Sequence, residues 1–395
     1  MQNNNIKNVK IIENFVIFFA FCLIIFAFIP FKTNNVFAEN DAFSEKISYN
    51  SSAKSAIVID SFSKRILFEK NINERLPMAS TTKIVTAITT IENCDDLDKV
   101  ITVDDRYVGI EGSSIYLKHG EEISIRELLY GLMLRSGNDA SVALAYAIAG
   151  GIDEFCEMMN NLAQKVGAKN SHFSNPHGLD DVNHFTTAYD LSLITSYALQ
   201  NNDFAEIVKT KRIKICEEKE NERLLVNKNK LLSKMDCCIG VKTGFTKKAG
   251  RCLVSACEKD GLKLVCVVLD CGPMFEESED LFNLAYNQFK KVEILPPYYF
   301  VKSAAVKGGK VENVGLCTKR GFDIVLSKKE LAGINVAFNA PDELNAPIKK
   351  DEIVGVCEIY YGNHLIFSEN IYTIEEVDSI LFKDKIKDIL NNWNA

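Results

Sequence analysis

A short segment that begins at Pro77 constrains the fold more than any other part of the chain. Apolar residues follow Ser80 at the spacing of a buried helix: Ile84, Val85, Ala87, Ile88 and Ile91. Ser80 and Lys83 are three residues apart, so both side chains lie on one face of that helix. A serine near a helix N-terminus with an amine beside it is a candidate activated nucleophile. Ser-x-x-Lys is common by chance, so the rest of the chain must decide whether this pair is catalytic.

A polar break interrupts a second helical region. Ser124 and Glu127 have the pattern of a capping box, which predicts a helix start. Apolar residues then keep helical spacing up to Ser136-Gly137-Asn138, and the apolar pattern resumes at Val142. Polar groups between two buried helices are costly without a partner or a purpose. The break is therefore either a helix–helix turn or part of a functional site.

Several runs have the pattern of antiparallel strands. Four of them pair into two predicted hairpins: 56–60 with 65–69, and 252–257 with 262–269. Another predicted strand, 239–245, carries Lys242-Thr243-Gly244. A glycine inside a strand often marks close approach by a ligand or another backbone. We therefore expect an α/β (α+β) fold with helices packed on an antiparallel sheet.

The C-terminal third has a different pattern. After a predicted helix at 281–289, Pro296-Pro297 marks a linker, and residues 291–372 form short alternating segments typical of a small β-rich domain. The apolar spacing of residues 374–395, which include Trp393, predicts an amphipathic helix. That helix either packs on its own protein or contacts a membrane surface.

The N-terminus has the pattern of an export signal. Lys7 and Lys10 precede an apolar run at 15–31, and Val36-Phe37-Ala38 supplies a cleavage site. We predict a signal peptide over residues 1–38, which places the mature protein at the extracytoplasmic face of the cell membrane or in the wall. The alternative is a retained membrane anchor.

Charge and cysteine content exclude some functions. The formal net charge is −7 and lysine and arginine do not cluster, which argues against a nucleic-acid partner. Twelve cysteines are present, but several lie in apolar strand-like runs and no Cys-x-x-Cys pair occurs. We expect mostly free thiols and no zinc site. The vicinal pair Cys237-Cys238 has no explanation at this level. His177 and His184 suggest a metal, but no third ligand stands at a recognisable spacing.

Three motifs taken together are specific where each alone is weak. They are Ser80-x-x-Lys83, Ser136-Gly137-Asn138 and Lys242-Thr243-Gly244, in that order. The order resembles the penicillin-recognising active-site serine enzymes. Gly137, with the flanking sequences Pro77–Lys83, Asn175–Asp180 and Lys242–Gly250, is similar to the low-molecular-mass penicillin-binding proteins that are D-alanyl-D-alanine carboxypeptidases. The likeness runs from about residue 45 to the C-terminus.

This resemblance implies a β-lactamase-like catalytic domain over 45–290, followed by the β-rich domain. It also implies an acyl-enzyme mechanism on the pentapeptide stem of peptidoglycan, with β-lactams as inhibitors and neither a metal nor an organic cofactor. Ser80 is then the nucleophile that attacks the penultimate D-alanine carbonyl, neutral Lys83 its base, and Ser136 the relay of the proton to the departing D-alanine.

The remaining motif residues are implied to bind substrate. Asn138 positions the substrate amide, and Lys242 supplies the positive potential that keeps Lys83 neutral. Thr243 binds the terminal carboxylate beside Gly244, and the backbone N–H groups of Ser80 and Phe245 form the oxyanion hole. His177 and Asp180 brace the site. Many relatives carry an arginine near the position of Glu277, and Arg251 is a candidate replacement.

Three rival functions stay open. A β-lactamase needs a deacylating glutamate, and no Glu-x-x-Leu-Asn occurs between residues 139 and 239. A non-catalytic wall-binding protein is opposed by the intact Ser80, Lys83, Ser136 and Lys242. An endopeptidase or transpeptidase outcome on the same acyl-enzyme is not separated from carboxypeptidase action by the sequence.

Overall fold

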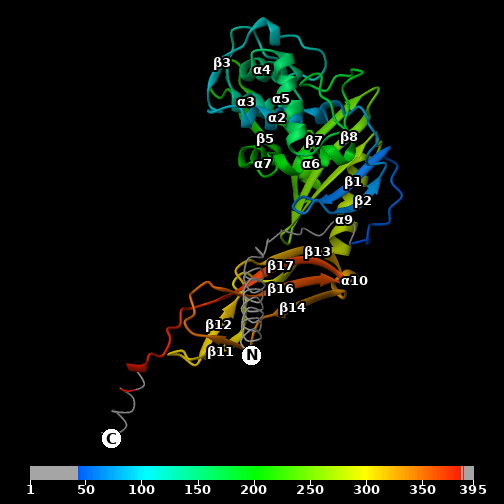
Figure 1. Ribbon diagram of the computed structural model, residues 1–395. Coiled ribbons are helices and arrows are strands. Elements are labelled where there is room, and N and C mark those ends of the chain that lie inside the picture. Colours follow the sequence, from blue (N-terminus) through cyan, green and yellow to red (C-terminus); the bar gives the residue numbers. More distant parts are fainter. Residues whose placement is uncertain (1–42, 384–385, 387–395) are drawn as a thin grey trace, which may run out of the picture. The chain divides into compact units, whose positions relative to one another are not determined.

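The computed structural model describes residues 43–383 and residue 386 (Figure 1). The predicted signal peptide, residues 1–38, lies outside the described residues. The described chain divides into two compact units. The larger unit contains residues 43–296 and 322–334, and the smaller unit contains residues 297–321 and those from 335 onward.

An antiparallel five-stranded sheet forms the frame of the larger unit. Its strand order is β2-β1-β9-β8-β7. The strands are β1 (Ser55–Asp60), β2 (Ile66–Lys70), β7 (Cys238–Thr246), β8 (Gly250–Lys259) and β9 (Leu262–Leu269). Both predicted hairpins are confirmed, and the motif-bearing strand β7 lies at the edge of the sheet.

Helices cover the two faces of this sheet, and α2–α7 gather on one of them (Figure 1). The helices of the larger unit are α2 (Lys83–Glu92), α3 (Ile125–Tyr130), α4 (Asn138–Ala149), α5 (Ile152–Lys165), α6 (Ala188–Ala198), α7 (Asn202–Lys209), α8 (Leu231–Lys234), α9 (Met274–Gln288) and α10 (Lys328–Leu331). Side chains of α2–α7 share one apolar core with alternate residues of the sheet. Side chains of α8 and α9 share a second core with the sheet residues that face the opposite side, such as Leu253 and Leu264. The sheet is therefore apolar on both faces, and the mixed fold class is confirmed.

Short elements complete the larger unit. They are the 3-10 turns η1 (Ala79–Thr82) and η2 (Asp105–Tyr107), the π-helical segment η3 (Gly131–Arg135), and the strand pairs β3 (Val100–Thr102) with β4 (Glu122–Ser124) and β5 (Arg212–Ile215) with β6 (Arg223–Val226). The predicted capping box is confirmed, because Ser124 and Glu127 bond each other's backbone N–H groups. The predicted helix at 281–289 begins earlier, at Met274, and Phe289 already belongs to a strand.

The smaller unit is built on a six-stranded sheet, which confirms the β-rich prediction. Its order is β14-β16-β17-β12-β11-β15. The strands are β11 (Phe300–Lys307), β12 (Asn313–Cys317), β14 (Ile334–Asn339), β15 (Glu343–Asn345), β16 (Ile353–Tyr361) and β17 (His364–Thr373).

One strand pair from the C-terminal third of the chain belongs to the larger unit. Strand β13 (Phe322–Ser327) pairs with β10 (Phe289–Leu295), and α10 follows it. Arg65, beside β2, reaches this segment: it bonds the Val325 carbonyl and forms an ion pair with Glu330 of α10. The two side chains are only 5% and 0% exposed.

The predicted amphipathic helix over 374–395 is wrong for its first turns. Residues 374–381 are not helical, and their backbone bridges link Val377 to Ile348 and Ser379 to Gly309. The Val377 side chain is buried, so packing within the protein accounts for this apolar residue. Residues 384–385 and 387–395 lie outside the described residues. No helix in the described part of the chain has the length and apolarity that crossing a bilayer requires.

Candidate active site

Ser80 lies in η1, the tight turn that leads into α2, so the predicted buried helix is present but begins at Lys83. The preceding residue, Ala79, has a φ of 49°, a left-handed conformation that is costly for a side-chain-bearing residue. Gly178 packs directly on this turn, and any side chain at Gly178 would overlap the Ala79 carbonyl oxygen. The surrounding structure therefore holds Ser80 in a constrained turn.

The Lys83 side chain, which is fully buried, lies beside the Ser80 hydroxyl. Its Nζ atom lies 3.1 Å from Oγ of Ser80 and 2.7 Å from Oδ1 of Asn138, and it also donates to the His177 carbonyl. These three oxygens come from the turn η1, from α4 and from the 175–180 loop. The amine is thus aimed at the hydroxyl by groups from three parts of the sequence.

Burial and two other lysines keep the amine of Lys83 easily deprotonated. Burial is the largest cause that lowers the pKa of Lys83 well below its ordinary value, and the charges of Lys242 and Lys228 lower it further. Lys242 is itself buried, and burial followed by the charge of Lys228 lowers its pKa to about 7. Lys242 therefore lowers the pKa of Lys83, as expected, but burial lowers it more.

The polar break at Ser136 joins η3 to α4. Ser136 adopts a left-handed conformation, with φ 66° and ψ 34°, which ends the π-helical segment and lets α4 start at Asn138. Asn138 is buried; its Oδ1 accepts from Lys83 and its Nδ2 donates to the Glu111 carbonyl. The break is a helix–helix turn, and it also carries Asn138, which contacts Lys83, and Ser136, which lines the same cleft as Ser80.

Strand β7 passes very close to Ser80 because Gly244 has no side chain. A Cβ atom there would lie 3.0 Å from the Met78 carbonyl oxygen and 3.1 Å from the backbone nitrogens of Ser80 and Thr81. Gly244 therefore marks a close approach of two backbones, as the sequence predicted. Lys242, two residues earlier, is turned inward and donates to the Thr243 carbonyl at 2.8 Å.

A cleft of about 460 Å³ opens at this junction, within the usual size range of small-ligand sites. Its lining comes from the three motifs and from residues outside them: Ser80, Ser113, Ser136, Lys228, Thr243, Gly244, Phe245, Arg251, Met274 and Phe275. Lys83, Asn138 and Lys242 lie behind this lining. All eight sequence-predicted site residues therefore meet at one place, in two layers.

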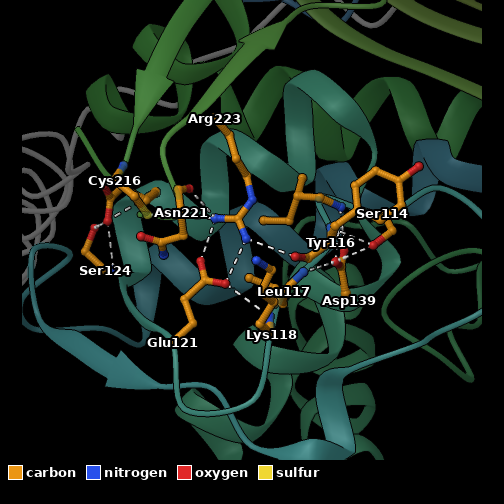
Figure 2. A network of polar contacts seen from close by, with 12 residues as sticks. Ser114, Tyr116, Leu117, Lys118, Glu121, Ser124, Asp139, Cys216, Asn221 and Arg223 are labelled. Carbon is orange, nitrogen blue, oxygen red and sulfur yellow. Dashed lines mark hydrogen bonds and ion pairs between the residues drawn. The ribbon is translucent and has the colours of Figure 1, made fainter. Parts of the chain in front are cut away.

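A network of polar contacts fixes the loop that forms one edge of the cleft (Figure 2). The buried carboxylate of Asp139 accepts from the backbone N–H groups of Ile115 and Leu117 and from the Ser114 hydroxyl. Arg223 forms an ion pair with Glu121, with an Nη2–Oε2 distance of 2.7 Å, and also donates to the Tyr116 carbonyl at 2.9 Å. Glu121 is almost fully buried. The loop carrying Ser113 is thus anchored both to α4 and to β6.

Both candidate histidines have structural partners. The His184 Nδ1 atom accepts from the Ser174 N–H, so Nε2 carries the proton and donates to Thr82 Oγ1 at 2.7 Å. Burial, followed by the charge of Lys83, lowers the pKa of His177 to about 4, so His177 is neutral at pH 7. Asp180 accepts from Thr246 at the end of β7. These contacts tie the 175–184 segment to the start of α2 and to β7.

Glu277 does not face the cleft. Its carboxylate is buried and accepts from the Ser52 N–H at 2.7 Å and from the Ser51 and Ser52 hydroxyls. An acidic residue at this position would not help to bind a carboxylate, but the Glu277 side chain is held by Ser51 and Ser52 and is absent from the cleft lining. Arg251 does line the cleft, together with Met274 and Phe275 from the first turn of α9.

Comparison with known proteins decides the family. Residues 41–272 match the family model described as D-alanyl-D-alanine carboxypeptidase, and residues 289–379 match the C-terminal domain of penicillin-binding protein 5. The chain belongs to the D-alanyl-D-alanine carboxypeptidase family. It is 31% identical over 350 residues to the carboxypeptidase DacF of Bacillus subtilis, covering 86% of this chain and 90% of that one.

Further family members agree along most of the chain. The carboxypeptidase DacD of Escherichia coli is 32% identical over 341 residues, covering 82% of this chain and 87% of that protein. The solved structure of penicillin-binding protein 5 from Haemophilus influenzae superposes with a TM-score of 0.67 at 25% identity, covering 84% of this chain and 99% of that one. This carboxypeptidase-family chain is accordingly a serine hydrolase with a β-rich C-terminal domain.

Sequence reasoning missed several groups of this carboxypeptidase-family site. Lys228 and Ser113 belong to no spaced motif and line the cleft only through the folding of distant segments. Asp139 of α4 does not line the cleft, but it accepts hydrogen bonds from the loop that carries Ser113. The only local signal was Asp139, an acidic residue directly after Asn138 in a run that is otherwise apolar.

Proposed function

We propose that this enzyme removes the terminal D-alanine from peptidoglycan pentapeptide stems through an acyl-enzyme on Ser80. The observation that carries the proposal is the buried Lys83 amine 3.1 Å from the Ser80 hydroxyl, at the floor of a cleft of ligand size. A neutral amine at that distance is a general base for the hydroxyl proton. The names of the relatives support D-Ala-D-Ala as the bond attacked.

Acylation follows from the order of the groups. Neutral Lys83 takes the hydroxyl proton as the Ser80 oxygen attacks the carbonyl carbon of the penultimate D-alanine. The backbone N–H groups of Ser80 and Phe245 flank the close β7–η1 junction and would hold the developing oxyanion. Ser136, at the edge of the cleft, would pass the proton to the nitrogen of the departing D-alanine. Water then hydrolyses the ester, with Lys83 again acting as base.

Residues of β7, β8 and α9 form the wall that would bind the substrate. Thr243 and the cationic Arg251 line the same cleft, so they would bind the terminal carboxylate, with the charge of Lys242 behind them. Asn138 holds Lys83 in this state, and its proposed contact with the substrate amide would require its side-chain amide to exchange partners. Met274 and Phe275 supply the apolar part of the wall.

The decisive assay measures free D-alanine released from a diacetylated pentapeptide ending in D-Ala-D-Ala. We expect release by the wild-type protein and none by Ser80→Ala, whose fold is checked by thermal melting. The same pair is tested with a fluorescent penicillin, which should label only the wild type.

The same experiment separates the rivals. Turnover of penicillin at many cycles per second, in place of a slow acyl adduct, would identify a β-lactamase. Release of a cross-linked partner peptide without free D-alanine would identify an endopeptidase. Absence of both labelling and release would leave a wall-binding protein.

Export and membrane contact belong to this proposal on sequence grounds alone. Cleavage after Ala38 predicts that the mature protein starts at Glu39, which N-terminal sequencing of the protein from cells tests. Membrane contact by the tail is tested by vesicle co-sedimentation of the chain with and without residues 382–395. Equal sedimentation of the two forms would remove the tail from that role.

A further inference from the structure

Three thiols that the proposed mechanism does not use converge at the start of β7. Cys237 and Cys238 are adjacent in sequence, and Cys257 lies opposite Cys238 on β8. Cys257 is fully buried and Cys238 is 5% exposed, whereas Cys237 is partly exposed. All three are free. The vicinal pair therefore has a third thiol beside it and one route to solvent.

The strand register places two of these thiols in a geometry suited to a covalent bond. The Glu258 N–H donates to the Cys237 carbonyl at 2.9 Å, so Cys237 and Glu258 are a hydrogen-bonded pair. Hydrogen-bonded and non-hydrogen-bonded pairs alternate along an antiparallel ladder, so Cys238 and Cys257, which pair next, are of the second kind. Such pairs have Cα atoms about 4.5 Å apart and the closer side chains, within the range of a disulfide.

The buried thiols of Cys238 and Cys257 affect each other's ionisation. The Cys238 thiol, then burial and also the Cys237 thiol, raise the pKa of Cys257 far above its ordinary value. Hydrogen bonding from Cys257 lowers the pKa of Cys238. Cys257 therefore holds its proton more firmly, and Cys238 is the more readily ionised member of the buried pair.

We propose that Cys237, Cys238 and Cys257 form a dithiol–disulfide site that reacts with a low-molecular-mass disulfide and ends as a Cys238–Cys257 cross-strand bond. The partly exposed Cys237 is the entry thiol. The proposal is independent of the carboxypeptidase activity, because it concerns the opposite end of β7 from Thr243-Gly244-Phe245.

Each step exchanges one sulfur for another. The Cys237 thiolate attacks the reagent RSSR, forming Cys237–S–S–R and releasing one RS⁻, which is protonated to RSH. The Cys257 sulfur attacks the Cys237 sulfur as its proton passes to the neighbouring Cys238 thiolate, and the second RS⁻ leaves. That RS⁻ takes the proton from Cys238, and the Cys238 thiolate then attacks the Cys257 sulfur and returns Cys237 to the thiolate. In sum, two protein thiols are oxidised by two electrons, one RSSR is reduced, and two RSH leave with the two thiol protons.

The bond would tie the start of β7 to β8 and close a loop of about 20 residues. Cross-links of this loop length stabilise mainly by restricting the unfolded chain, so the melting temperature of the oxidised protein should rise by roughly 5 °C. Thiol reagents such as dithiothreitol should reverse the shift.

The test treats the folded protein with oxidised glutathione, blocks the remaining thiols by alkylation, and maps tryptic peptides by mass spectrometry. We expect peptide 235–242 joined to peptide 252–259 with the loss of two hydrogens. Cys257→Ala should abolish this species, and Cys238→Ala should stop at a Cys237–Cys257 bond between the same two peptides, which tandem mass spectrometry distinguishes. Cys252→Ala, at a buried thiol in the same peptide as Cys257, should keep the Cys238–Cys257 bond. Penicillin labelling confirms that each variant is folded.

Two further measurements make the proposal decisive. Cys237→Ser should slow cross-linking at least tenfold but still yield the Cys238–Cys257 bond, whereas cross-linking at the wild-type rate would overturn the entry role. Cys317, a thiol flanked by Lys319 and Asp351, should stop at a glutathione adduct. A wild-type protein that carries only glutathione adducts, or a cross-link through Cys252, would overturn the site itself.

Discussion

The amine of Lys83 lies 3.1 Å from the hydroxyl oxygen of Ser80, and Lys83 is fully buried. Lys83→Met keeps the length and apolar stem of the side chain but removes the base. We expect the rate of penicillin acylation to fall by roughly 10²–10⁴-fold, the usual worth of general-base help, with little change in melting temperature. Time courses of fluorescent labelling measure this. Lys165→Met, at an exposed lysine, is the control, and equal rates in the two variants would remove Lys83 from the role of base.

Lys228 should set the pH range in which the site works. Its charge lowers the pKa of both Lys83 and Lys242. Acylation needs Lys83 neutral and, as we propose, Lys242 charged, so the rate should rise with pH as Lys83 loses its proton. It should fall again as Lys242 loses its own proton, from about pH 7.

In Lys228→Gln, both lysines lose a neighbouring positive charge, so the pKa values of both must rise. The acidic and alkaline limbs of kcat/KM against pH should both move to higher pH, and activity below pH 7 should fall severalfold. Lys169→Gln changes the net charge equally at an exposed site. A profile in Lys228→Gln that coincides with that of Lys169→Gln would show that Lys228 has no electrostatic role.

Gly244 permits β7 to approach Ser80, so its substitution should damage the chemistry more than the fold. In Gly244→Ala the new methyl group would lie 3.0–3.1 Å from three backbone atoms, which belong to Met78, Ser80 and Thr81. The strand and the turn must separate, and small misplacements of reacting groups cost about 10²-fold in rate. Gly272→Ala adds its methyl group in open space. Acylation measured on both should fall only in Gly244→Ala; equal rates would mean that the close approach is not needed.

The ion pair of Arg65 and Glu330 should contribute strongly to the stability of the larger unit. Removing one partner leaves an uncompensated buried charge, so Arg65→Met should lower the free energy of unfolding by about 3–5 kcal/mol. Replacing both partners, as Arg65→Met with Glu330→Gln, should recover part of that loss. Lys46→Met, in an exposed pair with Glu69, should cost less than about 1 kcal/mol. Denaturant unfolding measures all three, and a similar loss in Arg65→Met and Lys46→Met would contradict the argument.

Local patterns predicted the elements better than their long-range partners. The spacing after Ser80 and the capping box at Ser124 act within a few residues, so both helices were found. Lys228 and Ser113 join the site only through contacts between segments that are far apart in the chain, which no periodicity encodes. The tail from Ile374 shows the converse: its apolar spacing suits a helix, but pairing of Val377 with Ile348 satisfies the backbone in an extended form.

Arg251 should recognise the terminal carboxylate of the substrate. It lines the cleft with Thr243 and Phe245, and the backbone register sets it directly opposite Phe245. A hydrogen bond to a charged group contributes about 1.5–3 kcal/mol, and solvent exposure reduces this, so Arg251→Gln should lower kcat/KM for the pentapeptide roughly tenfold. The same pentapeptide ending in a carboxamide has no charge to bind, so wild type and Arg251→Gln should hydrolyse it at similar rates. If Arg251→Gln lost tenfold in kcat/KM on both substrates, Arg251 would instead support the shape of β7 and β8. If Arg251→Gln matched the wild type on both substrates, carboxylate binding would be left to Thr243 and Lys242.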